Sequence, residues 1–120
     1  MAFTILAVDD CASTRQIVGH TLRQAGYAVV EAIDGLEALA YARSHPADLV
    51  LTDVNMPKMD GITLVRELRR LDSYKYVPVL VLTTEAGQDE KMAGKQAGAT
   101  GWLVKPLDPE KLLATIARIR

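Results

Sequence analysis

Acidic, hydroxyl and amine side chains recur in this chain where short apolar runs end. Asp9 and Asp10 follow the first such run, and Asp53, Thr83 and Lys105 stand at the ends of three others. Three carboxylates gathered at one place would raise one another's pKa values unless a cation neutralised them. Because the candidate ligands are oxygen atoms, without a histidine beside them, the pattern favours Mg²⁺ as that cation.

A carboxylate beside such an ion can act as a nucleophile toward phosphorus, because the metal offsets charge on the attacking oxygen and on the phosphoryl group. Asp53 is the candidate nucleophile, and its product would be an aspartyl phosphate. Lys105 offers a compact positive charge and Thr83 a hydroxyl donor to the phosphoryl oxygens. Cys11 adjoins the acidic pair, but a thiol is a poor ligand for Mg²⁺.

These residues need a scaffold that brings separate chain segments to one edge. Runs rich in Val, Ile and Leu predict strands at Thr4–Val8, Ala28–Ala32, Leu49–Thr52, Val79–Thr83 and Gly101–Val104. Helical spacing of apolar residues predicts helices at Ser13–Gln24, Leu36–Arg43, Ile62–Leu71, Asp89–Gln96 and Pro109–Ile119. Asp60 and Asp108 are expected to cap helices, and Gly26 and Gly98 to end them.

Strict alternation of strand and helix predicts an α/β fold, a flavodoxin-like (βα)5 doubly wound sandwich. Its parallel sheet of five strands is expected in the order 2-1-3-4-5. In such sheets ligands bind beyond the carboxyl ends of the strands, where the winding reverses between strands 1 and 3. The polar residues above converge on that edge.

Composition sets limits on the class of protein. A chain of 120 residues that is 49% apolar fits one domain, over residues 1–120. A formal charge of −1 offers no strongly basic face, so neither nucleic acid nor a membrane is an expected partner. A single cysteine and the lack of an apolar run of membrane-spanning length are typical of a cytoplasmic protein.

The motifs resemble those of response-regulator receiver domains, most closely the stand-alone chemotaxis kind. The resemblance rests on Val8-Asp9-Asp10, the run from Leu51 to Gly61 that contains Asp53 and Met56-Pro57, Leu82-Thr83-Thr84, and Lys105-Pro106. It implies that Asp53 accepts a phosphoryl group from a histidine kinase, and that Mg²⁺ binds Asp9, Asp10, Asp53 and the backbone carbonyl of Asn55. Thr83 and Lys105 would sense the phosphate, and the Lys105–Pro106 bond would be cis.

The same resemblance implies a conformational switch, in which Thr83 moves toward the phosphate and Trp102 swings inward. Tyrosine or phenylalanine is more usual at the position of Trp102, and a smaller residue at that of Thr84. Asn55 and Glu85 would modulate turnover of the phosphorylated state. Such a protein promotes its own phosphorylation and dephosphorylation but is a signalling switch rather than an enzyme.

The resemblance also suggests partners. A chemotaxis-type histidine kinase would donate the phosphoryl group, and a phosphatase is a further candidate. A flagellar motor switch protein is the leading target, bound through the fourth helix, fifth strand and fifth helix. A phosphate sink, a phosphorelay receiver and a receiver that forms part of a larger regulator are the alternatives.

Single residues and the whole chain also have other interpretations. A magnesium-dependent phosphatase of the haloacid dehalogenase kind needs an acid where Asn55 stands. A flavin- or nucleotide-binding module needs a Gly- or Ser/Thr-rich phosphate loop where the chain has Asp9-Asp10. Trp102 alone could be a half-buried aromatic at a sheet edge, and His20 and His45 are expected to have surface or packing roles.

Overall fold

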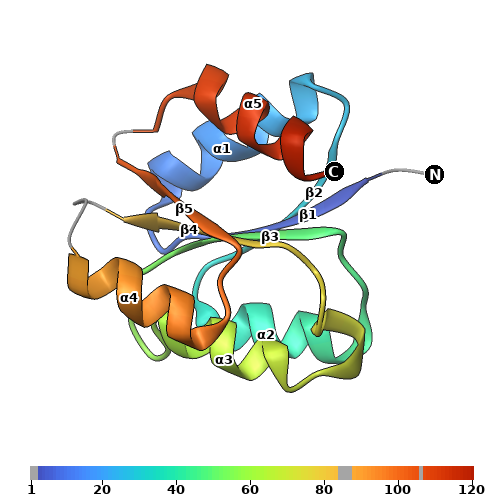
Figure 1. Cartoon of the computed structure of the whole chain (residues 1–120). Coiled ribbons are helices and arrows are strands. Elements are labelled where there is room, and N and C mark those ends of the chain that lie inside the picture. Colours follow the sequence, from blue (N-terminus) through green and yellow to red (C-terminus); the bar gives the residue numbers. More distant parts are fainter. Residues whose placement is uncertain (1–2, 84–87, 106) are drawn as a thin grey trace.

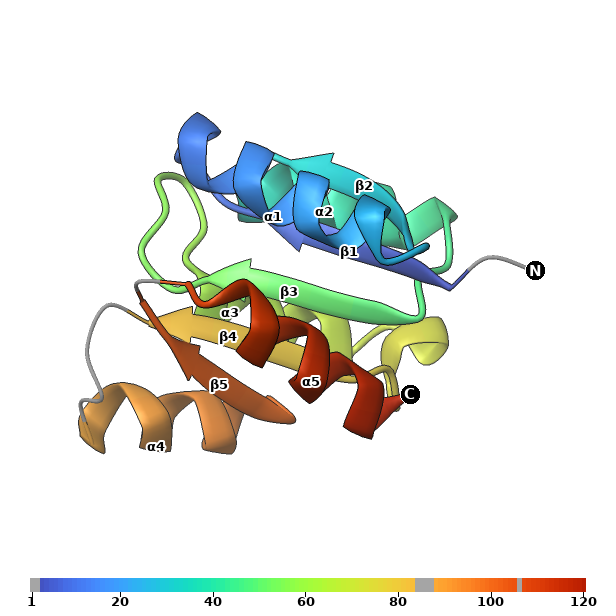
Figure 2. The ribbon, with the colours of Figure 1, turned by 90° about the horizontal axis from the view of Figure 1, so that it is seen from above.

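Five parallel strands form one sheet in the order β2-β1-β3-β4-β5. The structure is a computed structural model that describes residues 3–83, 88–105 and 107–120. The strands are β1 (Thr4–Val8), β2 (Ala28–Ala32), β3 (Leu49–Asp53), β4 (Val79–Thr83) and β5 (Gly101–Val104). The predicted fold class and strand order are therefore confirmed, and all strand bounds match except that β3 includes Asp53 as its last residue (Figure 2).

Helices cover both faces of the sheet. They are α1 (Ala12–Gln24), α2 (Gly35–Ser44), α3 (Gly61–Arg69), α4 (Gln88–Ala97) and α5 (Pro109–Ile119). Figure 1 shows α1 and α5 on one face and α2, α3 and α4 on the other. Each predicted helix is present, and most ends differ by one residue from the expected bounds.

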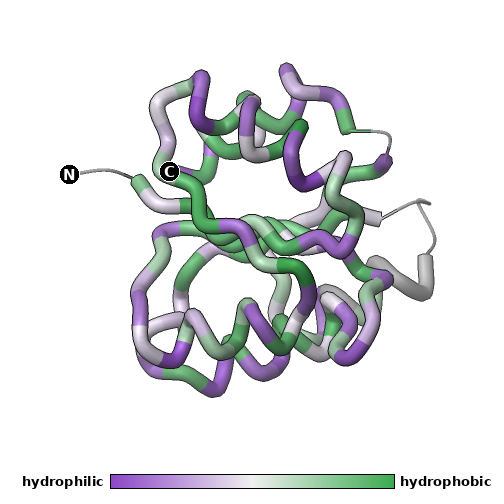
Figure 3. The backbone as a smooth tube through the Cα atoms, turned by 180° about the vertical axis from the view of Figure 1, so that it is seen from behind, coloured by the Kyte–Doolittle hydropathy of each residue, from purple (hydrophilic) through white to green (hydrophobic). Residues whose placement is uncertain are grey.

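Burial follows position in the sheet. Every residue of the central strand β3 and of its neighbour β4 is buried, as strands covered on both faces require. In the edge strand β5 burial alternates along the chain, with Trp102 and Val104 exposed and Gly101 and Leu103 less so. Buried apolar side chains form two clusters, so one core lies on each side of the sheet. Figure 3 shows that hydrophobic residues are frequent along the central strands.

Local chemistry fixes the helix ends where the sequence predicted. The carboxylates of Asp60 and Asp108 accept hydrogen bonds from the amides of Thr63 and Glu110, so both act as N-caps. Asp34 caps α2 in the same way. Gly26 has a φ of 94°, a left-handed conformation that glycine adopts without strain, and it leads the chain out of α1.

The chain between α3 and β4 differs from the prediction. Helix α3 ends at Arg69 rather than Leu71, and a short 3₁₀ helix, η1 (Asp72–Tyr74), follows. The apolar spacing continued to Leu71 because Leu71 packs on the core, but it does so as the residue before η1. Tyr74 is fully buried, and its hydroxyl donates a hydrogen bond of 2.7 Å to the carbonyl of His45.

Arg69 ties this region to the end of α4. Its guanidinium donates to the carbonyls of Tyr74 and Val77 at 2.8 Å and 2.6 Å, and to the carbonyl of Gly98 at 2.8 Å and 3.0 Å. Backbone carbonyls thus surround a cation that burial disfavours, and burial lowers the pKa of Arg69. Within the described residues, no helix is both long and apolar enough to cross a bilayer.

Candidate functional site

The acidic residues predicted from sequence meet at the carboxyl edge of the sheet. Asp9 and Asp10 directly follow β1, and Asp53 closes β3, the strand beside it. One carboxylate oxygen from each of the three lies within 4.8 Å of the others. Asp9 and Asp53 are buried whereas Asp10 is exposed, so the cluster opens to solvent on the side of Asp10.

Asp53 is held by its own strand end. Its Oδ1 accepts a hydrogen bond of 2.8 Å from the amide of Val54, and its Oδ2 lies 3.0 Å from Nζ of Lys105. Helix α3 begins against the same backbone, because the amide of Gly61 donates to the carbonyl of Val54 and a Cβ at Gly61 would collide with the carbonyl of Asp53. The carboxylate therefore has a fixed orientation, with Oδ2 toward the lysine.

Asp9 is only 3% exposed, so its charged carboxylate is the least well solvated of the three. Its Oδ1 accepts a hydrogen bond of 2.9 Å from the amide of Cys11, whereas its Oδ2 is buried and accepts no hydrogen bond from the part of the chain that the structure describes. Burial raises the pKa of Asp9, and the nearby charge of Asp53 raises it further, against the opposing effects of the Cys11 amide and Lys105.

Lys105 bridges three strands. It follows β5, its Nζ lies 3.0 Å from Asp53 and 3.7 Å from Asp9, and its backbone amide donates to the carbonyl of Thr83 at the end of β4. Burial by itself lowers the pKa of Lys105, but the hydrogen bond with Asp53 and the charges of the three carboxylates raise it above its ordinary value. The amine is therefore a firmly charged group.

The donor set fits a hard divalent cation. One positive charge on Lys105 faces three carboxylates, and the buried Oδ2 of Asp9 has no hydrogen-bond donor among the described residues to stabilise it. Mg²⁺ binds carboxylate oxygens and retains water molecules, which the open side at Asp10 would admit. Asp9, Asp10 and Asp53 are the residues that would hold it.

The other predicted residues fall into four groups. Thr83 is 1% exposed at the end of β4, next to β3 and β5, and so lies at the same edge. Asn55 is exposed in the loop after Asp53. Trp102 lies farther back on β5 and is 37% exposed, which agrees with a partly buried aromatic at the sheet edge. Thr84, Glu85 and Pro106 lie outside the described residues.

Three further contacts at the carboxyl edge of the sheet were not predicted. Arg15 of α1 donates a hydrogen bond of 2.8 Å to the backbone carbonyl of Asp9. Lys58, in the loop after β3, has a φ of 68° and lies 3.8 Å from Asp34 at the start of α2. The amide of Cys11 binds Asp9, although its thiol has no expected role. Residue types alone do not predict these contacts, because two of the three involve backbone atoms.

Comparison with known proteins identifies the class to which this fold and site belong. Residues 5–117 match the response regulator receiver domain family, so the chain belongs to that family. Among curated proteins it is similar to chemotaxis protein CheY of Pseudomonas aeruginosa, with 40% identity over 116 residues that cover 96% of this chain and 94% of that protein. It is thus a CheY-like receiver domain of the two-component response regulators.

Solved structures agree. Chemotaxis protein CheY4 of Vibrio cholerae superposes with a TM-score of 0.96 and 50% identity over 100% of both chains. The receiver domain of sensor histidine kinase PA1611 from Pseudomonas aeruginosa gives a TM-score of 0.91 and 30% identity, covering 98% of this chain and 97% of that one. That structure has a magnesium ion coordinated in its active-site cleft.

Proposed function

We propose that this chain is a response regulator that accepts a phosphoryl group on Asp53 from a histidine kinase and then changes conformation to bind a target. The observation that carries the proposal is the placement of Oδ2 of Asp53 at 3.0 Å from Nζ of Lys105, within a cluster that includes Asp9 and Asp10. In this proposal Asp53 is the nucleophile, Lys105 is the cation that faces the phosphoryl group, and Asp9 and Asp10 are the pair that binds the metal.

The residues of the chain divide the work of the reaction. The amide of Val54 holds Oδ1 of Asp53, which leaves Oδ2 to attack phosphorus. A new bond forms between this oxygen and phosphorus, the bond from phosphorus to the histidine nitrogen breaks, and the imidazole leaves with the electron pair and takes up a proton. Lys105 faces the charge on the phosphoryl oxygens, and Thr83 donates its hydroxyl to another of them.

Mg²⁺ bound by Asp9, Asp10, Asp53 and the Asn55 carbonyl would neutralise charge on the phosphoryl group. After transfer, Asn55 and Glu85 set the rate at which water removes the group. Thr83 and Trp102 report its presence to the rest of the domain. The protein is then a switch with a slow self-catalysed turnover rather than an enzyme with a separate substrate.

Similarity to CheY proteins supports a place in chemotaxis, in the cytoplasm, as a single receiver domain over residues 1–120. The donor is then a chemotaxis-type kinase, and the target is a flagellar motor switch protein bound through α4, β5 and α5. A phosphate sink, a relay receiver or a part of a larger regulator would use the same phosphorylation site with a different target.

Phosphorylation in vitro tests the central step. A small phosphodonor with Mg²⁺ should add one phosphoryl group per chain, measured as intact mass, and chelation of Mg²⁺ should prevent it. Asp53→Asn should abolish the addition, because an amide is not a nucleophile toward phosphorus at neutral pH.

Asp72→Asn is the matched control. It makes the same substitution at an exposed aspartate of η1, far from the carboxyl edge, and should be phosphorylated like the wild type. Unchanged labelling of Asp53→Asn would refute the assignment of the acceptor.

A further inference from the structure

The backbone of Asp9 is held at both of its polar groups, although it lies beyond the end of β1. Its amide donates to the carbonyl of Ala32 on β2 at 3.1 Å, and its carbonyl accepts from Nη1 of Arg15 at 2.8 Å. This carbonyl belongs to the peptide unit that joins Asp9 to Asp10. Because a peptide unit is planar, the hydrogen bond from Arg15 fixes the direction in which the chain leaves Asp9 for Asp10.

Arg15 is itself held by a second element. Its Nε lies 3.4 Å from Oε1 of Glu31 on β2, and its side chain is only 18% exposed. Arg23 pairs with the other oxygen of Glu31 at 3.0 Å but is 51% exposed and donates to the carbonyl of Val29, away from the acidic pair. Two arginines therefore share one carboxylate, and of the two only Arg15 contacts the Asp9–Asp10 peptide unit.

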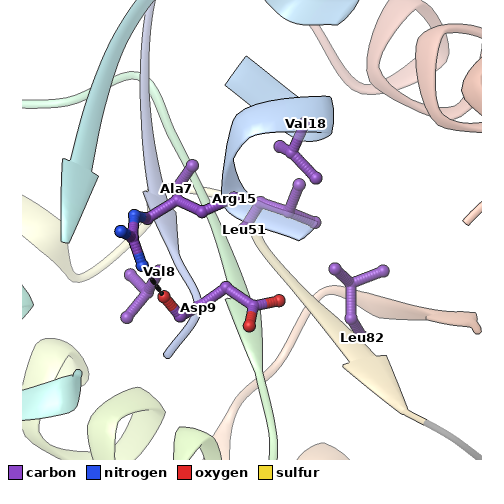
Figure 4. A pocket seen from close by; sticks show the side chains of 7 residues that line it. All are labelled: Ala7, Val8, Asp9, Arg15, Val18, Leu51 and Leu82. Atoms are coloured by element: carbon purple, nitrogen blue, oxygen red, sulfur yellow. Dashed lines mark hydrogen bonds between the residues drawn. The ribbon is translucent and has the colours of Figure 1, made fainter. Parts of the chain in front are cut away.

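Figure 4 shows how Arg15 lies against Asp9. The guanidinium points to the backbone carbonyl, and the carboxylate of Asp9 points to the other side of the chain. The stem of Arg15 and the apolar side chains of Val18, Leu51 and Leu82 line a partly open pocket of about 10 Å³ next to Asp9, too small for more than one water molecule. Arg15 thus supports Asp9 without neutralising its carboxylate directly.

From these contacts we infer that Arg15 is a positioning residue for the Mg²⁺ site: it fixes the Asp9–Asp10 peptide unit so that both carboxylates face the same ion. The inference rests on the proposed function, because it requires that these carboxylates bind Mg²⁺. Residues that orient metal ligands through a second contact commonly change metal affinity by a factor of about 10 to 100 when they are removed.

The charge of Arg15 and its positioning role predict opposite changes in Mg²⁺ affinity when the residue is removed, which makes the inference testable. Arg15 carries a positive charge close to an anionic site, so its removal should tighten Mg²⁺ binding if only Coulomb repulsion between the two cations matters. If Arg15 positions the ligands, its removal should weaken binding in spite of the gain in negative charge. The sign of the change therefore distinguishes the two effects.

The experiment is a calorimetric titration of the full chain with MgCl₂ at constant ionic strength, with urea unfolding of each variant as a check on folding. Arg15→Met keeps the apolar stem that lines the cavity but removes every donor, and should raise the dissociation constant by about tenfold or more. Arg15→Lys retains the charge but not the fork of donors that spans Asp9 and Glu31, and should weaken binding by about threefold.

Arg23→Met is the matched control, since it removes the same charge from the same glutamate without touching Asp9, and its dissociation constant should stay within twofold of the wild type. A constant for Arg15→Met that is unchanged or lower would overturn the inference. Should that variant not fold, an unchanged constant for Arg15→Lys overturns it instead. Absence of Mg²⁺ binding by the wild type would overturn the proposed metal site as well, which separates the two failures.

Discussion

Burial changes the ionisation of single side chains in this protein. Asp9 and Tyr74 are both nearly or fully buried, and burial raises the pKa of both. For the aspartate the raised pKa disfavours the charged form that a metal site needs. For the tyrosine it favours the neutral hydroxyl that donates to His45. Burial therefore destabilises the charged carboxylate of Asp9 at the functional site, whereas it stabilises the neutral hydroxyl of Tyr74 on which the fold depends.

Tyr74 predicts a loss of stability at alkaline pH. Burial raises its pKa from 10.0 to about 12 in the folded protein. Because the folded-state pKa lies above the unfolded one, the contribution to stability is complete below pH 10 and is lost as the pH rises through 12, by about 3 kcal/mol in all. Urea unfolding at several pH values measures this, as the difference in unfolding free energy between wild type and Tyr74→Phe.

The Tyr74→Phe variant should be about 1 kcal/mol less stable than the wild type at neutral pH, because it lacks the hydrogen bond to His45, and the difference should reverse between pH 10 and 12. Tyr76→Phe serves as the control. Tyr76 is 87% exposed, so its substitution should leave the pH dependence unchanged. A constant difference between wild type and Tyr74→Phe from pH 8 to 12 would contradict the assigned pKa.

At the scale of residues, sequence predicted the types that meet at the site but not the contacts that hold them. Asp9, Asp10, Asp53 and Lys105 were found because each stands at the end of an apolar run, and runs of this kind are visible in a sequence. Arg15 was missed because its partner at the site is a backbone carbonyl. Nothing in the identity of a residue reveals which carbonyl a strand end leaves without a partner.

Among the elements, β5 carries two of the residues that matter most. Lys105 follows its last residue and contacts the acidic cluster, while Trp102 lies three positions earlier and is 37% exposed. Trp102 also borders a hollow of about 290 Å³ between β5 and α5, lined by Leu107 and Leu112. A displacement of Lys105 would act directly on the strand that carries the tryptophan.

The fluorescence of Trp102 should change when Lys105 displaces β5. Trp102 is the only tryptophan in the chain, so its emission reports on β5 alone. Beryllofluoride, a mimic of the phosphoryl group, should change that emission only when Mg²⁺ is present, because an inward movement of the indole changes its exposure to water. Asp53→Asn should give no change. Beryllofluoride bound to the wild type, as seen by fluorine NMR, without any change in emission would contradict the switch role.

Element prediction succeeded where a pattern repeats and failed where tertiary contacts decide. The strands were located to within one residue, because buried parallel strands are apolar throughout and glycine or proline often flanks them. The 3₁₀ helix η1 was missed, since three residues are too few to show a period. Its position depends on two hydrogen bonds: Arg69 donates to the carbonyl of Tyr74, and the hydroxyl of Tyr74 donates to the carbonyl of His45, which is distant in the sequence.

The molecule as a whole is destabilised by the site that it carries. Two buried carboxylates and an exposed third lie close together against one lysine, so the folded protein without Mg²⁺ holds more negative charge than its surroundings can neutralise. Because the pKa of Asp9 is raised in the folded protein, its protonated carboxyl contributes stability at acid pH, and this contribution is lost as the carboxyl ionises.

Asp9→Asn should therefore stabilise the protein at neutral pH in the presence of a chelator, by on the order of 1 kcal/mol in urea unfolding. Saturating Mg²⁺, at about 100 times its dissociation constant, should stabilise the wild type by about 3 kcal/mol and the variant much less. Asp72→Asn should behave like the wild type in both conditions. Greater stability of the wild type than of Asp9→Asn in chelator would refute this account.

The close approach of α3 to the acceptor also offers a spectroscopic reporter. The amide of Gly61 donates to the carbonyl of Val54, one residue after Asp53, and no side chain larger than hydrogen fits there. Glycine amides resonate in a sparsely populated region of a proton–nitrogen spectrum, and this chain has only eight glycines. The Gly61 signal can therefore be resolved in the unmodified protein, and its shift would record the state of Asp53 in real time without a label at the site.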